Sequence, residues 1–343
     1  MKFGIVGLPQ AGKRTLFKAL TGVRGEGPSP MEGGVATVVV HDPRVDFLSE
    51  LYRPKKTTYA RIEYLLPSGP TASAKRSEAE TWGHLRVCDA LVHVVRNFKL
   101  PGDLGPQPEK DFWQLEEEMI LADLAVAEKR VERLKADIKR GRKEGVKELE
   151  LLESCLEILS RGEPLRSVPY LRSEPALRGF TFLSAKPALV LVNNEDEDVS
   201  EPQWSRKPAM TTTMAVRARL EMEIAAMEPE EAEEFKKAYG IQESMLDRII
   251  EASFKLLDRI SFFTGNPDEV RAWPIPSGTP ALEAAGVVHS DMKKGFIRAE
   301  VISYDQLKAH GSLQAAKKAG AVRLEGKEYI VQDGDVIYFR FNV

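Results

Sequence analysis

Cysteine, long apolar runs and an excess of one charge are all scarce in this sequence. Its two cysteines, Cys88 and Cys155, lie far apart in different expected elements, which argues against a disulfide framework and indicates a reducing compartment. The lack of paired Cys or His spacing argues against a structural zinc site. No apolar run reaches about 18 residues, and we expect no signal peptide before the first strand. We therefore expect a cytoplasmic protein that does not span a membrane.

The charges of the chain nearly cancel, with a formal net charge of -3. The sequence therefore has no general attraction to nucleic acid, and any such contact must come from a local basic patch. Hydrophobic residues make up 43% and charged residues 29% of the sequence, as in an ordinary globular protein. Because one domain usually holds about 100–200 residues, a length of 343 residues predicts two or three domains.

The N-terminus carries the pattern of a phosphate-binding loop. The apolar run 3–6 predicts a strand, and the spacing of Leu16, Phe17 and Leu20 predicts a helix. The residues between them fit G-x-x-x-x-G-K, in which glycines let backbone N–H groups wrap a phosphate and the lysine reaches the β- and γ-phosphates. A tight turn that binds nothing is the alternative. The expected phosphate-binding residues are Gly7, Leu8, Pro9, Gln10, Ala11, Gly12, Lys13, Arg14 and Thr15.

One position of this motif is unusual. A Ser or Thr normally follows the lysine because its hydroxyl ligates magnesium. Here Arg14 follows Lys13, and Thr15 comes one place late. One interpretation is that Arg14 supplies positive charge where magnesium would lie, and the other is that Arg14 points away to solvent or to an acidic neighbour. Magnesium is therefore doubtful as a cofactor, and we expect no metal ligands.

The middle of the chain alternates α and β patterns around a helical insertion. Apolar runs predict strands at 37–40, 62–66, 90–95 and 188–192, and the last two suit buried parallel strands. Apolar residues recur at steps of three and four from Leu124 to Ile138, and a second helical pattern runs from Leu149 to Leu159. This spacing predicts an antiparallel coiled-coil hairpin, inserted into an α/β domain with a mostly parallel sheet.

The C-terminal part is expected to form a small α+β domain. Helical patterns fill roughly residues 217–260, and strand-like runs occupy 296–302, 328–332 and 336–339. The sequence Asp-Gly-Asp at 333–335 lies between the last two runs and predicts a hairpin turn.

Several segments together resemble the Obg-like ATPases, the YchF subfamily of the Obg-type P-loop GTPases. They are residues 5–13, 42–46 and 90–96 and, most specifically, stretches within 270–301 and 323–336. The resemblance covers essentially the whole chain. It implies a P-loop G domain, an inserted helical hairpin and a C-terminal TGS domain of β-grasp fold. The implied boundaries are 1–110 and 183–259 for the two parts of the G domain, 111–182 for the hairpin and 260–343 for the TGS domain.

The departures from the family's pattern concern the metal, the γ-phosphate and the attacking water. Arg14 occupies the position of the family's magnesium-binding Ser. The family's D-x-x-G motif aligns with residues 66–69, so that Leu66 occupies the position of the motif's Asp. The Phe-x-Thr of switch I is missing from residues 25–34, and no His occurs between residues 94 and 288, where the family has a catalytic one. Since removing one transition-state contact costs ~100-fold or more in rate, we expect weak or absent hydrolysis and no catalytic residue.

The segment after the run 188–192 is the expected base-binding site. Asn193, Asn194 and Asp196 resemble the GTPase motif N-K-x-D with Asn194 in place of Lys, and a carboxylate at this place suits guanine. A one-residue slip gives Asn194 to Glu197, which restores the N-x-x-E that accompanies adenine in the family. A solvated acidic loop is a third interpretation. The sequence therefore leaves open the choice between ATP and GTP.

The hairpin tip is basic. It holds Lys139, Arg140, Arg142, Lys143 and Lys147 against Glu144 and Glu148. Such a tip suits the phosphates of ribosomal RNA, although a solvated turn has the same composition. We expect a purine-nucleotide-binding protein that resembles ribosome-associated ATPases and contacts the ribosome through the tip and the TGS domain. The alternatives are an active NTPase that needs an activating partner and an interaction scaffold with an empty G domain.

Overall fold

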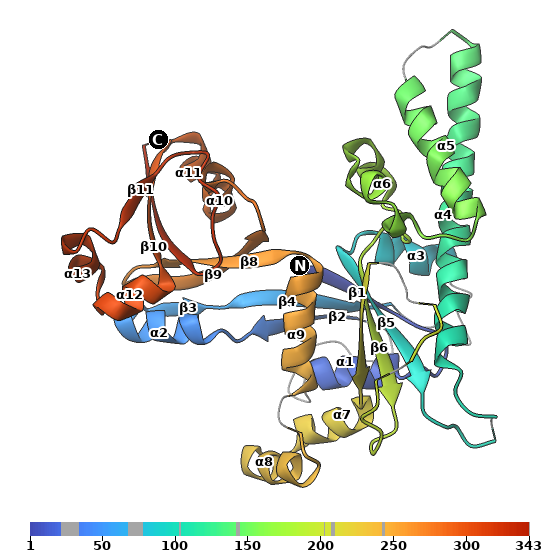
Figure 1. Ribbon diagram of the computed structural model, residues 1–343, viewed down its shortest axis with the longest axis horizontal. Coiled ribbons are helices and arrows are strands. Elements are labelled where there is room, and N and C mark those ends of the chain that lie inside the picture. Colours follow the sequence, from blue (N-terminus) through green and yellow to red (C-terminus); the bar gives the residue numbers. More distant parts are fainter. Residues whose placement is uncertain are drawn as a thin grey trace. The chain divides into compact units, whose positions relative to one another are not determined.

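The chain forms two compact units (Figure 1). The first contains Met1–Val38 and Glu63–Leu256, and the second contains Val39–Ile62 and Leu257–Val343. This computed structural model describes residues 1–21, 34–67, 78–102, 104–141, 145–201, 203–206, 210–241 and 244–342.

The first unit is built on a six-stranded sheet with the order β2-β4-β1-β5-β6-β7. β1 pairs in parallel with β4 and β5, and β6 pairs in parallel with β5 and β7. The fold class is therefore α/β with a mostly parallel sheet, as the sequence predicted. A ligand of such a sheet usually binds at the carboxyl ends of the strands. The strands are β1 (Lys2–Val6), β2 (Gly34–Val40), β4 (Ala60–Leu66), β5 (Ala90–Asn97), β6 (Ala188–Asn194) and β7 (Thr211–Val216).

Helices cover this sheet and explain why its central strands are apolar. All seven residues of β6 are buried, as is typical of a parallel strand packed on both faces. The expected helical stretch 217–260 contains three helices, but the expectation missed β7, which precedes them. The helices are α1 (Lys13–Thr21), α3 (Glu78–Arg86), α7 (Ala218–Ala226), α8 (Pro229–Ala238) and α9 (Met245–Leu256).

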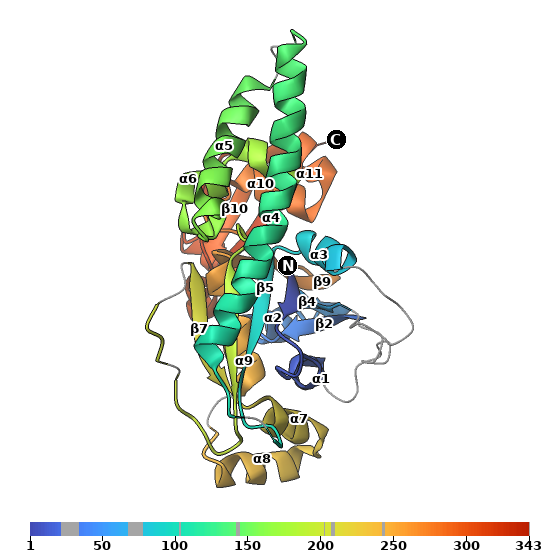
Figure 2. The ribbon, with the colours of Figure 1, turned by 90° about the vertical axis from the view of Figure 1, so that its right-hand side faces the viewer.

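Two long helices confirm the predicted hairpin. α4 (Pro108–Lys139) and α5 (Val146–Ser160) lie side by side in both ribbon views (Figures 1 and 2). Arg130 Nε lies 2.7 Å from Glu148 Oε1, and this ion pair joins the two helices. The chain returns to β6 through η1 (Leu165–Ser167), α6 (Pro169–Ser173) and η2 (Pro175–Phe180). The buried seam between the two helices contains Ala127, Val131, Leu134, Leu152, Cys155 and Leu159.

The second unit contains another six-stranded sheet, with the order β11-β10-β12-β8-β9-β3. Its apolar core includes Phe262, Ile275, Ala285, Phe296 and Ile337, so that α10 packs on one face of the sheet. The strands are β3 (Lys56–Thr58), β8 (Arg259–Gly265), β9 (Glu269–Pro276), β10 (Phe296–Ser303), β11 (Arg323–Glu325) and β12 (Asp335–Phe341). The helices are α2 (Pro43–Tyr52), α10 (Ala281–Val288), α11 (Ser290–Lys294), α12 (Tyr304–His310) and α13 (Leu313–Lys318).

The predicted hairpin turn at 333–335 is wrong. The run 328–332 does not form a strand, and Ile330 makes only an isolated bridge with Pro280. β12, which begins at Asp335, pairs with β10 and β8 instead. The physical reason is a long-range contact, because the N–H of Gly334 donates to the carbonyl oxygen of Ser261 at 2.9 Å. β8 and β9 were also not predicted from the sequence.

Residues 39–62 group with the C-terminal unit, although the sequence-based division placed them in the first part of the G domain. β3 pairs in parallel with β9. Arg44 of α2 pairs with Asp333 at 2.7 Å, and the hydroxyls of Tyr52 and Tyr338 are 2.5 Å apart. These partners are more than 200 residues away in sequence, so no local pattern could indicate the grouping.

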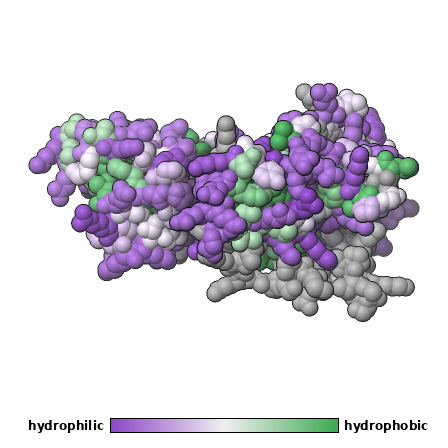
Figure 3. Space-filling model, turned by 90° about the horizontal axis from the view of Figure 1, so that it is seen from below, coloured by the Kyte–Doolittle hydropathy of each residue, from purple (hydrophilic) through white to green (hydrophobic). Residues whose placement is uncertain are grey.

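The face shown in Figure 3 is mostly hydrophilic, with its apolar residues in small separate groups. Among the helices that the structure describes, none combines the length and the apolar composition that a membrane crossing requires.

Candidate functional site

The loop between β1 and α1 requires glycine at two positions. Gly7 and Gly12 have φ angles of 154° and 94°. A Cβ atom at Gly7 would collide with the carbonyl oxygen of Val94, and one at Gly12 would collide with the side-chain amide of Asn193. The loop thus runs directly against β5 and β6. It places the N-terminus of α1 at the carboxyl edge of the sheet, where the helix dipole attracts anions.

The Lys13 side chain folds back onto this loop and forms hydrogen bonds with its backbone. Its Nζ donates to the carbonyl oxygens of Gly7 at 2.7 Å and Leu8 at 2.8 Å. Burial of the amine, and then the charge of Arg14, lower the pKa of Lys13 to about 8. The amine is therefore bonded only to neutral carbonyl oxygens, and from this position it could contact an anion bound at the loop.

A cleft of about 740 Å³ opens beside the loop. The sequence motif gave one wall of this cleft. It gave no sign of the other wall, to which β4, α3, α4 and the segment that follows β5 contribute apolar and aromatic side chains. Leu66 and Pro67 belong to the segment 66–69 that the D-x-x-G alignment had indicated, and the lining side chains that the sequence did not indicate are Thr81, Trp82, Leu85, Phe98, Leu100, Leu115 and Glu118.

Arg14 and Thr15 follow Lys13 in the first turn of α1, and both line the cleft. Arg14 is exposed and Thr15 is half-buried. Across the part of the chain that the structure describes, the Arg14 guanidinium has neither a hydrogen bond nor an ion pair. Arg14 therefore has no acidic partner among these residues, and its exposed side chain agrees both with a place beside the phosphates and with a place in solvent.

The residues at the cleft do not fit a magnesium ion. Magnesium requires oxygen ligands, usually carboxylates together with phosphates and waters. Arg14 stands where the phosphate-loop motif would supply a hydroxyl, Leu66 stands where the aligned D-x-x-G would supply a carboxylate, and Glu118 is the one carboxylate that lines the described cleft. In the described ranges, no three His, Cys, Asp or Glu residues are grouped so that they could hold a metal ion.

Asn193 connects the loop to the next part of the site. Its Nδ2 donates to the carbonyl oxygen of Ala11 at 3.2 Å, and its Oδ1 accepts from the N–H of Ala218 at 3.0 Å. The side chain is buried at the end of β6. One amide thus joins the phosphate loop to the start of α7 and fixes the distance between them.

Asn194 and Asp196 lie differently from Asn193. The amide of Asn194 is buried, accepts from Asn97 Nδ2 at 2.9 Å and donates to the carbonyl oxygens of Asp198 and Ser200. Its oxygen and both its hydrogens are therefore engaged within the protein. Asp196 lies further along the same loop, where its Oδ2 accepts from Arg219 Nε at 2.7 Å.

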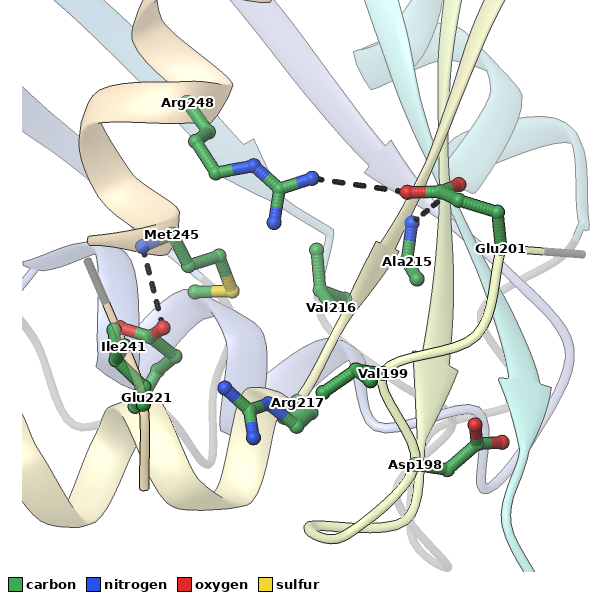
Figure 4. A pocket seen from close by; sticks show the side chains of 11 residues that line it. Asp198, Val199, Glu201, Ala215, Val216, Arg217, Glu221, Ile241, Met245 and Arg248 are labelled. Carbon is green, nitrogen blue, oxygen red and sulfur yellow. Dashed lines mark hydrogen bonds and ion pairs between the residues drawn. The ribbon is translucent and has the colours of Figure 1, made fainter. Parts of the chain in front are cut away.

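A second hollow of about 290 Å³ lies at β7, the edge strand of the sheet (Figure 4). Arg248 points toward Glu201, with 3.8 Å between the ion-pair atoms, and Glu201 also accepts from a backbone N–H of β7 at 3.2 Å. Glu221 accepts from the N–H of Met245 at 3.2 Å, and burial raises the pKa of Glu221. None of the sequence-predicted site residues lines this hollow.

A buried polar cluster lies close to the loop. The ring of His93, on β5, stacks on Phe112 of α4 with 4.8 Å between centroids. His93 Nδ1 lies 3.9 Å from one oxygen of Glu116, whose other oxygen pairs with Arg166. Burial, and then the charges of Arg166 and Lys13, lower the pKa of His93 to about 3. His93 is therefore neutral near pH 7, and Arg166 supplies the positive charge beside Glu116.

Acid should destabilise the protein through His93. In the unfolded chain this side chain takes up a proton near pH 6.5, whereas in the folded protein it stays neutral down to about pH 3. Its contribution to stability is complete above pH ~6.5 and is lost as the pH falls from there toward 3, by about 1.4 kcal/mol per pH unit. Denaturant unfolding of the wild type and of His93→Gln across this range should give a shallower pH dependence for the variant. If the unfolding free energies of the two proteins changed with pH in the same way, the lowered pKa of His93 would be contradicted.

Comparisons with known proteins agree over the whole chain. Residues 259–342 match the YchF-GTPase_C family, described as "Protein of unknown function (DUF933)". A protein of Bacillus subtilis (strain 168) named Ribosome-binding ATPase YchF is 39% identical, with 99% of each chain covered. A protein of the same name from Escherichia coli O157:H7 is 37% identical, with 100% of this chain and 99% of the relative covered.

Solved structures show the same fold. The YchF GTPase of Schizosaccharomyces pombe has a TM-score of 0.83 and 28% identity, covering 99% of this chain and 97% of its own. A GTP binding protein from Pyrococcus horikoshii OT3 has a TM-score of 0.59 and 18% identity over 100% of both chains, which is a likeness of fold alone.

Proposed function

This chain belongs to the YchF family, and from the geometry of its phosphate loop we propose that it binds a purine nucleotide, ATP or GTP. Lys13 carries the proposal, because its amine lies on the two loop carbonyls beside a cleft of about 740 Å³. An incoming phosphate would replace these neutral partners with charged oxygens, which form stronger hydrogen bonds with an ammonium group. We assign phosphate contacts to residues Gly7 through Thr15. Calorimetric titration with ATP and with GTP tests this, and the absence of binding by both would reject it.

The affinity for nucleotide should fall as the pH rises through about 8. Lys13 has a pKa of about 8 in the free protein, and bound phosphates would raise that pKa because they favour the charged amine. Binding therefore takes up a proton above pH ~8, and the affinity declines until the pH reaches the higher pKa of the complex. Titrations with ATP from about pH 7 to 10 measure the decline. The variant Lys13→Arg stays charged and should lose this dependence, whereas a flat profile in the wild type would contradict the role of Lys13.

The base is assigned to the loop after β6. Asn193 lies against the phosphate loop and Asp196 follows three residues later, which favours the N-x-x-D alignment over the one-residue slip. Asn194 remains among the proposed base-binding residues because it lies between Asn193 and Asp196 in the motif, although its amide already has hydrogen-bond partners within the protein. Competition of ATP and GTP for a bound fluorescent nucleotide tests base choice. Guanine recognition by Asp196 predicts that GTP displaces the probe more effectively and that Asp196→Asn removes the difference.

Hydrolysis is proposed to be weak or absent. Phosphoryl transfer depends on positioning and on neutralising the charge of the transition state. Arg14 and Leu66 stand at the two metal-supporting places, and the expected switch I and D-x-x-G glycine positions lie in segments outside the described residues. Release of inorganic phosphate from ATP and GTP should stay near the level of a Lys13→Met control.

A second candidate is an NTPase that is activated by a partner. It is favoured by the two relatives of 37–39% identity that bear the name Ribosome-binding ATPase. Phosphate release that rises when purified ribosomes are added would select this function over nucleotide binding alone. A ribosome partner would also place the protein in the cytoplasm.

The same relatives suggest the ribosome as the partner, contacted through the hairpin tip and the C-terminal unit. Lys139, Arg140 and Lys147 are exposed at the tip, whereas Arg142, Lys143 and Glu144 lie outside the described residues. Basic side chains at this place would contact RNA phosphates in a salt-sensitive way.

Reversing charge at the tip should weaken ribosome binding. The double variant Arg140→Glu with Arg142→Glu replaces attraction to phosphate by repulsion and should reduce co-pelleting with ribosomes by roughly tenfold or more at low salt. The matched control is Arg161→Glu with Arg178→Glu, which makes the same charge change at exposed positions away from the tip. Unchanged pelleting of the tip variant would exclude the tip as the contact.

A further inference from the structure

The cleft beside the phosphate loop has the charge pattern of an anion site without a metal. We propose that this protein binds its nucleotide as a metal-free anion, with the Arg14 guanidinium beside the phosphates where a magnesium ion would otherwise lie. The inference rests on the proposed binding of a nucleotide at this loop and concerns the form of the nucleotide that the loop accepts.

The position of Arg14 supports this role. It is the second residue of α1, directly after Lys13, and its side chain lines the cleft. The guanidinium is exposed and, within the described residues, is not paired with any carboxylate. Its charge lowers the pKa of Lys13, so the two cationic groups are close enough to act on one ligand. A guanidinium binds phosphate oxygens in a bidentate manner and keeps its charge at any physiological pH.

The opposite side of the cleft disfavours a cation. Leu66 ends β4 with its side chain buried, and it offers no oxygen to a metal or to a metal-bound water. Glu118 is the one carboxylate among the described lining residues, while Lys13 and Arg14 contribute two positive charges. A hard divalent cation needs several oxygen ligands and is repelled by neighbouring cations. The same two positive charges attract the free triphosphate anion and favour its binding.

This arrangement reverses the usual effect of magnesium. Magnesium cancels part of the negative charge of a triphosphate, so the magnesium complex is attracted less strongly to Lys13 and Arg14 than the free nucleotide is. The ion would also lie next to the guanidinium without a protein ligand. Excess magnesium should therefore compete with the protein for the nucleotide instead of promoting binding.

Calorimetric titration with ATP and with GTP tests the proposal in two buffers of equal ionic strength, one with EDTA and one with excess magnesium chloride. The wild type is expected to bind several-fold more tightly in EDTA. Arg14→Ser removes the charge and restores a hydroxyl at the metal position, so it should lose roughly 10- to 100-fold in affinity in EDTA. In the presence of magnesium, Arg14→Ser should instead bind more tightly than it does in EDTA. The matched control Lys18→Ser, at an exposed position of α1 outside the cleft, should behave as the wild type does.

Three results would overturn the proposal. Wild-type affinity that rises when magnesium is added would show that the site uses the ion. Equal affinities of the wild type and Arg14→Ser in EDTA would show that the guanidinium points to solvent. Both results leave nucleotide binding intact, whereas the absence of binding in either buffer would reject the proposed function together with this inference.

Discussion

Replacing Arg166 with methionine is expected to lower the free energy of unfolding by about 3–5 kcal/mol. Arg166 and Glu116 are 1% and 0% exposed, and they form an ion pair at the base of the hairpin. Burial raises the pKa of Glu116, and the charge of Arg166 opposes that rise. Without Arg166, the carboxyl group of Glu116 must either lie charged in an apolar site or take up a proton. Denaturant unfolding followed by circular dichroism measures the loss.

Two further variants separate the effect of a broken pair from that of a lost arginine. Arg161→Met breaks an exposed pair with Glu157 and should change the unfolding free energy by less than about 1 kcal/mol. The double variant Arg166→Met with Glu116→Leu removes both charges and should recover most of the stability, because an apolar pair of similar volume can replace a buried ion pair. If Arg166→Met were as stable as Arg161→Met, the buried pair would not have the role assigned to it.

Replacing Lys13 with methionine is expected to weaken the binding of ATP and GTP by roughly 100-fold. Hydrogen bonds to charged groups contribute about 1.5–3 kcal/mol, and the Lys13 amine would make such bonds to the phosphates. Methionine keeps a flexible side chain of similar length and removes the charge. A ligand that binds the folded state raises its stability by RT ln(1 + [L]/Kd), so the rise in Tm at saturating ATP should largely disappear.

The control for Lys13→Met is Lys18→Met, at an exposed lysine of the same helix. It should keep the wild-type affinity and the wild-type rise in Tm. The Tm of Lys13→Met without nucleotide must also be measured, because Lys13 bonds to Gly7 and Leu8 within the loop. Undiminished binding by Lys13→Met would place the nucleotide elsewhere. Absence of any ligand effect in the wild type would favour an interaction scaffold with an empty G domain.

The buried cluster of His93, Glu116 and Arg166 also shows how the hairpin is anchored. Asp123 of α4 is fully buried and accepts hydrogen bonds from Arg86 Nη1 at 2.8 Å and from the backbone N–H of Ser184 at 2.7 Å. The lower half of α4 is therefore held by charged groups to α3 and to the segment that precedes β6, whereas its upper half packs on α5 through apolar side chains and the ion pair of Arg130 with Glu148. A substitution at the base should act on the sheet and the phosphate loop, and one at the tip should not.

Much of the loop at the proposed phosphate site was predictable because it is local. Gly7, Gly12 and Lys13 lie within seven consecutive residues, and the strand and helix around them have strong patterns of their own. Apart from Leu66, the other wall of the cleft was not predictable, since Trp82 reaches it from α3 and Phe98 from the segment that follows β5. The position of Asn193 was predicted in part, and its role in base binding stays a prediction. Its alignment with a base motif was visible, but its bond to the phosphate loop was not.

The sequence by itself determined the α/β class, the phosphate loop and the helical hairpin. Each depends on spacing within one segment, because backbone preferences and the burial of one helix face or one strand act between near neighbours. The tertiary structure alone decided that β3 joins the sheet of the C-terminal unit, that residues 333–335 lead into β12 instead of turning a hairpin, and that Arg166 neutralises Glu116. These features arise from contacts between residues far apart in the chain, and the free energy of such contacts depends on which partner the fold brings near.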